Sequence, residues 1–253
     1  MKQKTILIPL PNYGFDPTEV AIPWQELKEA NFNVVFCTPE GKKAKTDKLM
    51  LTGEKLGVFK TVLQAKTPAV RAYLALEIDE SFCKPLSYKK ASITNFDALY
   101  LPGGHDKGVK EYLESPILQQ IAVSFFNAKK PVGAVCHGVV LLAKSIDAKT
   151  NKSVLYKYKT TALLKKQELM AYQMTKLWLK DYYLTYPEIT VEEEVTAVLA
   201  DVSQFLSGKT PVLRDTKKNL KRGFTVRDKN YLSARWPGDI YKFSNEFIDM
   251  LNE

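Results

Sequence analysis

The chain has 253 residues, enough for a substantial buried core, and its three cysteines are too few and too widely spaced for a disulfide framework or a metal knuckle. Its formal net charge is +9, but the lysine clusters at 42–48 and 217–222 lack interleaved aromatic residues, so we expect a solvated basic face and no nucleic-acid surface. No apolar run suits a signal peptide or a membrane span, which predicts a soluble, cytoplasmic protein with no membrane partner.

Short apolar runs alternate with amphipathic segments along the first half of the chain. A continuous apolar run is typical of a parallel strand that is buried on both faces. The segment 40–60 is charged and is expected to be irregular. We predict strands at 5–10, 33–38 and 98–101, and helices at 17–30, 67–82 and 115–128, the last capped by Ser115.

The second half continues this alternation and adds a helix-rich insertion. Residues 160–194 are dense in Tyr, Trp and Leu, and we interpret them as a helical cap whose aromatic side chains mostly pack it down. The remaining elements are a strand at 131–135, a helix at 139–145, a hairpin at 224–234 and a final helix at 237–251. The pattern predicts one α/β domain over 1–253, a doubly wound, mostly parallel sheet between helices, with ligands at the carboxyl ends of the strands.

The sequence Ala134-Val135-Cys136-His137-Gly138 joins a predicted strand directly to a predicted helix. A cysteine at such a corner is held in strained geometry above the sheet edge, as in a nucleophile elbow. A helix N-terminus and a neighbouring imidazole both favour the reactive thiolate. Cys136 is therefore the candidate nucleophile, and the alternative is a small buried structural residue.

Two other segments reach the same edge of the predicted sheet. Leu101-Pro102-Gly103-Gly104-His105 follows a strand, and the N–H groups of Gly103 and Gly104, with that of His137, are candidates for an oxyanion hole. Glu19 lies in the first turns of the first helix and is a candidate proton carrier if burial raises its pKa. A solvated acid at a helix start explains Glu19 equally well.

Either histidine of the chain is a candidate base for Cys136. Adjacent residues on a helix diverge, so His137 need not face the sulfur, but a residue at the elbow can turn its ring beside it. We favour His137 and keep His105 as the alternative and as a pocket residue.

Together these segments resemble the ThiJ/PfpI family of the class I glutamine amidotransferase-like superfamily. The resemblance spans most of the chain and includes Glu19-Val20-Ala21-Ile22-Pro23 and Ser233-Ala234-Arg235-Trp236-Pro237-Gly238. It implies a flavodoxin-like sandwich with Cys136 as nucleophile, Glu19 as its acid partner and His137 as the third member. Oxyanion donors from Gly104 and His137 are implied as well.

In the branch with Cys-His-Gly, an acid shortly after a Thr-Ala pair orients the histidine. Here the first acid after Thr161-Ala162 is Glu168, which becomes the candidate third acid. True glutaminases of the superfamily have a distal His-x-Glu pair after the nucleophile. This chain has no histidine after His137, so glutamine hydrolysis by that triad is excluded. Arg235, Trp236 and Pro237 are expected at the pocket.

The resemblance implies a cofactor-free and metal-free enzyme that acts on small reactive carbonyls or glycated substrates, as a glutathione-independent glyoxalase or deglycase. A PfpI-like peptidase or amidase uses the same pocket. The other classes are a redox sensor, in which Cys136 is oxidised and stabilised by Glu19, and a chaperone that uses the tyrosine-rich cap. The sequence does not determine which substrate is used or whether the protein forms a homodimer.

Overall fold

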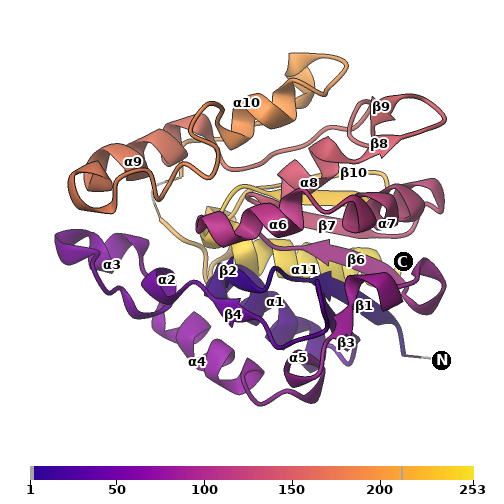
Figure 1. The fold of residues 1–253 in the computed structure, drawn as a ribbon, viewed down its shortest axis with the longest axis horizontal. Helices are drawn as coiled ribbons and strands as arrows, with labels where there is room; N and C mark the ends of the chain where they lie inside the picture. The colour runs from indigo at the N-terminus through magenta and orange to yellow at the C-terminus, as the bar shows by residue number, and fades with distance from the viewer. Residues whose placement is uncertain (1–2, 212) are drawn as a thin grey trace.

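The computed structural model describes residues 3–211 and 213–253. Seven strands form one central sheet in the order β10-β11-β7-β6-β1-β3-β5, and all neighbouring pairs are parallel except β10 with β11 (Figure 1). This arrangement confirms the predicted mostly parallel α/β sheet. The strands of this sheet are β1 (Thr5–Pro9), β3 (Asn33–Thr38), β5 (Leu86–Ser87), β6 (Ala98–Leu101), β7 (Val132–Val135), β10 (Thr225–Asp228) and β11 (Tyr231–Ala234).

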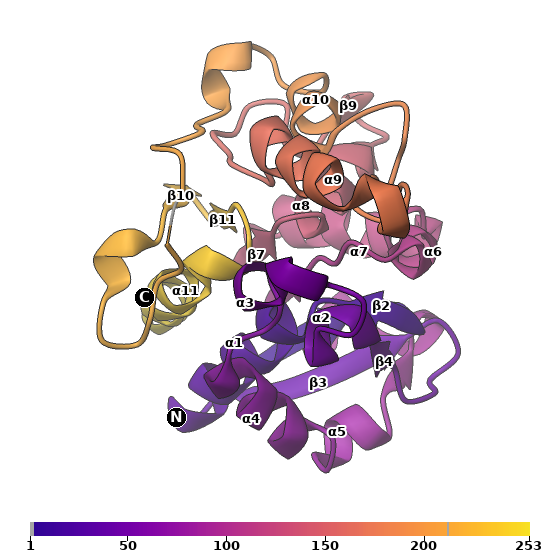
Figure 2. The same cartoon turned by 90° about the vertical axis from the view of Figure 1, so that its left-hand side faces the viewer.

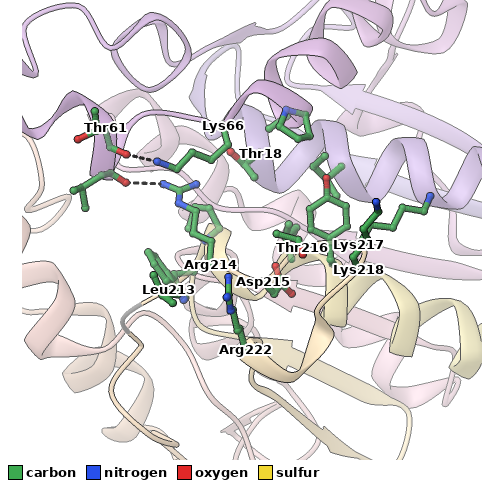
Figure 3. A pocket seen from close by; sticks show the side chains of 18 residues that line it. Thr18, Thr61, Lys66, Leu213, Arg214, Asp215, Thr216, Lys217, Lys218 and Arg222 are labelled. Carbon is green, nitrogen blue, oxygen red and sulfur yellow. Dashed lines mark hydrogen bonds between the residues drawn. The ribbon is translucent and has the colours of Figure 1, made fainter.

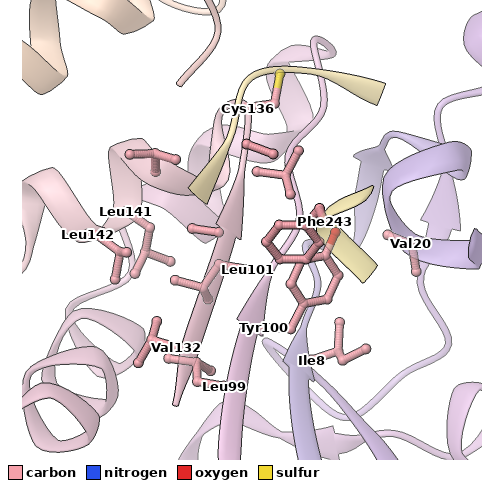
Figure 4. Close-up of a cluster of buried hydrophobic side chains, with 14 of the residues drawn as sticks. Ile8, Val20, Leu99, Tyr100, Leu101, Val132, Cys136, Leu141, Leu142 and Phe243 are labelled. Atoms are coloured by element: carbon pink, nitrogen blue, oxygen red, sulfur yellow. The ribbon is translucent and has the colours of Figure 1, made fainter. Parts of the chain in front are cut away.

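Helices cover both faces of the sheet because its strands are apolar on both sides. On β6, Tyr100 packs on Phe243 of α11, with ring centroids 5.2 Å apart. Leu99 and Leu101 point to the opposite side, where Leu141 and Leu142 of α8 lie (Figure 4). The larger helices of these layers are α1 (Pro17–Glu29), α4 (Thr67–Leu76), α7 (Pro116–Asn127), α8 (Gly138–Lys144) and α11 (Ile240–Asn252).

Two predicted segments differ from the structure. The helix expected over 67–82 is two helices, because Asp79 begins a new one by accepting a hydrogen bond from the Phe82 N–H at 3.1 Å. The segment expected to be irregular contains a helix capped by Asp47. The short elements are α2 (Lys48–Thr52), α3 (Lys60–Leu63), α5 (Glu80–Cys83), α6 (Lys110–Leu113), β2 (Tyr13–Phe15), β4 (Lys45–Thr46), β8 (Ile146–Asp147) and β9 (Lys152–Ser153).

The predicted helix-rich insertion consists of α9 (Lys165–Leu179) and α10 (Val191–Thr196) with the segment that joins them. Both views place these helices beyond the carboxyl ends of β6 and β7, over α8 (Figure 2). A capping box at Thr190 starts α10. The joining segment turns back toward the sheet, and this turn carries cap residues into the site described below.

None of the helices in the described ranges combines the length and apolar character that a membrane crossing requires.

Candidate functional site

Cys136 occupies the sharp corner between β7 and α8. Its φ of 57° lies in the left-handed region, a strained conformation for a residue with a side chain. Gly138 makes this corner possible, because a Cβ at that position would lie 2.1 Å from the carbonyl oxygen of Leu101. The strained corner is the geometry expected of a nucleophile elbow.

His137 forms the next part of the site, with its ring beside the sulfur. Its Nδ1 lies 3.4 Å from Sγ of Cys136, and its Nε2 lies 2.9 Å from Oγ1 of Thr185. The Thr185 hydroxyl donates its hydrogen to the carbonyl of His105 at 3.2 Å, so it accepts the N–H of Nε2. This network leaves the lone pair of Nδ1 facing the thiol, as a general base requires.

Glu19 is fully buried on the other side of Cys136. Its Oε2 accepts the N–H of Gly103 at 2.7 Å, and a Cβ added to Gly103 would lie 2.9 Å from Oε2 and 3.1 Å from Cβ of Cys136. Burial, and then the nearby Asp16 carboxylate, raise the pKa of Glu19 well above its usual range. Glu19 is therefore a buried acid beside the sulfur whose protonated form is favoured, not a solvated helix-start residue.

The charge state of the thiol differs from the expectation that the helix N-terminus and imidazole produce a thiolate. Burial raises the pKa of Cys136 well above its usual range, and the carboxyl groups of Glu19 and Asp16 add to this shift when they are ionised. Burial also lowers the pKa of His137 well below its usual range, with a further contribution from His105. The resting pair is a neutral thiol and a neutral imidazole.

The three candidate oxyanion donors differ in whether their N–H group is already hydrogen-bonded. The N–H of Gly103 is occupied by Glu19 and is not free for a substrate oxygen. Gly104 packs so closely on Gly14 that a Cβ would lie 2.4 Å from the Gly14 carbonyl oxygen. The N–H groups of Gly104 and His137 remain the predicted donors.

Glu168, the candidate third acid, does not contact His137. Its Oε2 accepts the N–H of Val191 at 3.0 Å, between α9 and α10, and burial raises its pKa to about 7. Thr185 takes the position beside His137 that an orienting acid was expected to fill. The spacing after Thr161-Ala162 did not identify the residue that orients His137, because that residue, Thr185, comes from the segment between the cap helices.

His105 and Tyr183 form a row of aromatic rings beside His137 and line a small cavity. The His105 ring stands edge-on to His137 and to Tyr183, with both centroid distances 5.0 Å. His105 and Tyr183 line a cavity of about 130 Å³, whereas Cys136 is only 1% exposed. His105 therefore lines this cavity, whereas Cys136 does not.

Two of the three residues predicted at the pocket near the last helix lie there. Trp236 and Pro237 line the same small cavity as His105. Arg235 instead is 2% exposed and forms a two-pronged ion pair with Asp239, with both N···O distances 2.8 Å. Its remaining nitrogen donates to the backbone at Lys209, so Arg235 is a structural residue.

Sequence reasoning missed three residues of this region, Asp16, Thr185 and Arg214, whereas Tyr183 is one of the cap aromatic residues of which a minority was expected at the pocket mouth. Asp16 caps α1 by accepting the N–H groups of Thr18 and Glu19, and the Pro17 that follows it is the signal that identifies such a cap. No sequence motif points to Thr185 or to Arg214. Within the described ranges, no group of three or more His, Cys, Asp or Glu residues is placed to hold a metal ion.

The family model described as ThiJ/PfpI family-like matches residues 10–197. The chain belongs to this family. An uncharacterised protein of Schizosaccharomyces pombe is 27% identical over 179 residues, a stretch that covers 66% of each chain. A glutathione-independent glyoxalase of the same yeast is 30% identical over 162 residues, 62% of each chain. The chain thus matches slightly less than two thirds of the length of these curated relatives.

Solved structures of low sequence identity share the fold. Glyoxalase III from Candida albicans superimposes with a TM-score of 0.67 at 17% identity, covering 98% of this chain and 97% of that chain. DJ-1beta of Drosophila melanogaster gives a TM-score of 0.56 at 18% identity, covering 98% and 90%. These similarities confirm the flavodoxin-like fold class predicted from the sequence.

Proposed function

We propose that this protein is a cysteine enzyme that converts small 2-oxoaldehydes, such as methylglyoxal, to 2-hydroxy acids without glutathione. The observation that carries the proposal is the placement of a thiol, a neutral imidazole and a protonated carboxyl around one strained corner. The glyoxalase among its yeast relatives supports the same chemistry.

In the first step, Nδ1 of His137 takes the thiol proton as Sγ of Cys136 bonds to the aldehyde carbon. Glu19 gives its proton to the aldehyde oxygen and becomes a carboxylate. The product is a hemithioacetal. Because the thiol ionises only as it attacks, its raised resting pKa is compatible with this step.

In the second step, the Glu19 carboxylate removes the hydrogen from the former aldehyde carbon, while the imidazolium of His137 protonates the neighbouring carbonyl oxygen. Glu19 then returns its proton to that neighbouring carbon, and the hydroxyl proton next to sulfur passes back to His137. The result is a thioester of the 2-hydroxy acid. Water then attacks the thioester carbonyl and gives a proton to the Glu19 carboxylate, while the imidazolium of His137 protonates the leaving sulfur. The hydroxy acid is released, and the thiol, the neutral imidazole and the protonated carboxyl are restored without a cofactor.

The size and charge of the site favour this reaction over the other candidates. The adjoining cavity of about 130 Å³ suits a small carbonyl and not a peptide chain. A peroxide sensor reacts through a resting thiolate. Burial raises the pKa of the Cys136 thiol, which disfavours that form, whereas the proposed attack removes the proton only as the new bond forms.

The test is methylglyoxal consumption by the purified protein without glutathione, with lactate identified as the product. Cys136→Ala and Glu19→Gln should each abolish turnover. Cys83→Ala is the matched control, because Cys83 is an exposed thiol outside the site and should leave turnover unchanged.

An inactive wild type would contradict the proposal. Activity that survives Cys136→Ala would also contradict it, because the carbonyl would then be consumed without the proposed nucleophile.

A further inference from the structure

A second, larger cavity of about 670 Å³ lies between the first turns of α1, the start of α11 and the segment around Arg214 (Figure 3). Its wall is rich in cations. Asp215 is the acid in this wall, and burial raises its pKa to about 7. The cations of the wall are Lys66, Arg214, Lys217, Lys218 and Arg222.

Close ion pairs neutralise little of this positive charge within the described part of the chain, although the carboxyl groups of Asp16, Glu19 and Asp215 act on Arg214 at longer range. Lys217 pairs with Glu26 and Glu29 at 2.9 and 2.6 Å. The other four cations have no carboxylate within 4.0 Å among the residues that the structure describes. A cavity with several unpaired cations is a favourable environment for an anion.

Arg214 is the cation that ordinary structural roles explain least. Its Nη2 donates to the carbonyl oxygens of Val62 and Leu63 at 3.3 and 3.1 Å, at the end of α3. Its Nη1 is buried and has no hydrogen-bond partner within residues 3–211 and 213–253. Burial of a guanidinium nitrogen without an acceptor costs free energy, and a ligand oxygen that accepts its hydrogen bond would remove this cost.

A second donor in the same wall, Nε1 of Trp236, is also buried without a partner among the described residues. The guanidinium of Arg214 lies over the Trp236 ring at 5.5 Å. Two unsatisfied donors on adjacent side chains suit a group that offers several acceptor oxygens.

Lys66 lies next to Arg214, and both side chains reach toward backbone carbonyls of α3 (Figure 3). Burial, together with repulsion from Arg214, lowers the pKa of Lys66. Burial lowers the pKa of Arg214 as well. An anion placed between these two side chains would relieve the repulsion.

Arg214 also connects this cavity with the small one beside the site. Val62, Arg214, Trp236 and Pro237 line both cavities, and the small one extends to His105. A ligand that holds an anionic group on Arg214 therefore extends toward the His105 ring beside His137.

We propose that Arg214, with the indole N–H of Trp236, anchors the anionic group of the substrate, so that the preferred substrate is a 2-oxoaldehyde carrying a carboxylate or phosphate. This inference rests on the proposed function for the reacting end of the molecule. The anchor itself is a property of the cavity and can be tested apart from turnover.

The first experiment compares kcat/KM for 4,5-dioxopentanoate, a 2-oxoaldehyde with a carboxylate, with kcat/KM for neutral methylglyoxal. We expect the wild type to prefer the anionic substrate by about ten-fold or more, the effect of one or two charge-assisted hydrogen bonds. Arg214→Met should remove that preference, measured as the ratio of the two kcat/KM values within the same variant. Arg71→Met is the control, because it removes the same charge from an exposed arginine of α4.

The second experiment measures binding without chemistry, by calorimetric titration with 4-oxopentanoate and with inorganic phosphate. Both probes should bind the wild type, and the tighter one identifies carboxylate or phosphate. Arg214→Met should abolish binding, and Trp236→Phe should weaken it because only the N–H is lost. Trp24→Phe is the matched control, since Trp24 is a buried tryptophan of α1 that does not line the cavity.

The two experiments separate the two proposals. A wild type that turns over methylglyoxal with no preference for 4,5-dioxopentanoate and binds neither probe overturns the anchor and leaves the glyoxalase proposal intact. A wild type that binds a probe through Arg214 but consumes no oxoaldehyde supports the anchor and overturns the reaction. If Arg214→Met does not fold, Arg214→Gln, compared at equal thermal stability, gives the same readouts.

Discussion

The hydroxyl of Thr185 lies 2.9 Å from Nε2 of His137 and donates its hydrogen to the backbone at His105. A residue of the cap thereby fixes the ring that faces the nucleophile. The cap is part of the site and not only a cover, because it decides which imidazole nitrogen carries the proton.

Thr185→Val tests this role. Valine keeps the shape but removes the hydroxyl, so we expect kcat/KM for the oxoaldehyde to fall by about ten-fold with little change in KM, as for one lost hydrogen bond. Thr185→Ser should retain activity. Thr175→Val is the control, because that buried hydroxyl donates to the carbonyl of Ala171 at 2.8 Å, within α9. Equal losses in the two valine variants would assign Thr185 a purely structural role.

The close approach at the elbow predicts a large loss of stability for Gly138→Ala. The new Cβ would lie 2.1 Å from the Leu101 carbonyl oxygen, so β6 or α8 must move. We expect the free energy of unfolding to fall by about 3 kcal/mol or more, measured by denaturant titration. Gly57→Ala is the comparison: its φ is 53° but open space surrounds it, so the loss should be about 1 kcal/mol. Similar losses at both glycines would contradict the steric argument.

The raised pKa of Glu168 predicts how stability depends on pH. Burial raises this pKa from 4.5 to about 7, so the folded chain holds the proton more tightly than the unfolded chain. The stabilising contribution is therefore complete below about pH 4.5 and is lost as the pH rises through about 7.

Glu168→Gln keeps a neutral group at this position. The variant should become more stable relative to the wild type between pH 5 and pH 8, which is measured as the difference in melting temperature. The corresponding change in the difference between the two free energies of unfolding has an upper limit of roughly 3 kcal/mol. Asp47 and Asp215 also have pKa values raised to about 7, but they are unchanged in the variant and cancel in the comparison. Glu188→Gln, at an exposed position, should show no such trend, and a flat difference for Glu168→Gln would refute the prediction.

The burial of Cys136 predicts the order in which thiols react. Iodoacetamide should modify the exposed Cys83 well before Cys136, which is 1% exposed. Tyr183→Ala removes a ring that packs on His105 and should increase the labelling rate of Cys136, measured by peptide mass spectrometry. Tyr156→Ala, in a half-buried tyrosine that lines a different cavity, should not. Fast labelling of Cys136 in the wild type would contradict a closed site.

The sequence by itself determined the order of strands and helices, the strained corner at Cys136 and the family. These features depend on local patterns: apolar runs, caps, and a strand that turns directly into a helix. The boundary at Asp79 is also local, but helical periodicity across residues 67–82 concealed it.

Only the tertiary structure decided the protonation states and the partners of the site. The charge of Cys136 and Glu19 depends on burial, which no spacing reveals, and it reverses the thiolate expected from the helix N-terminus. Thr185 and Arg214 reach the site from the segment between the cap helices and from a loop before the last hairpin. Their roles depend on long-range packing, because each lies far along the chain from the group it serves.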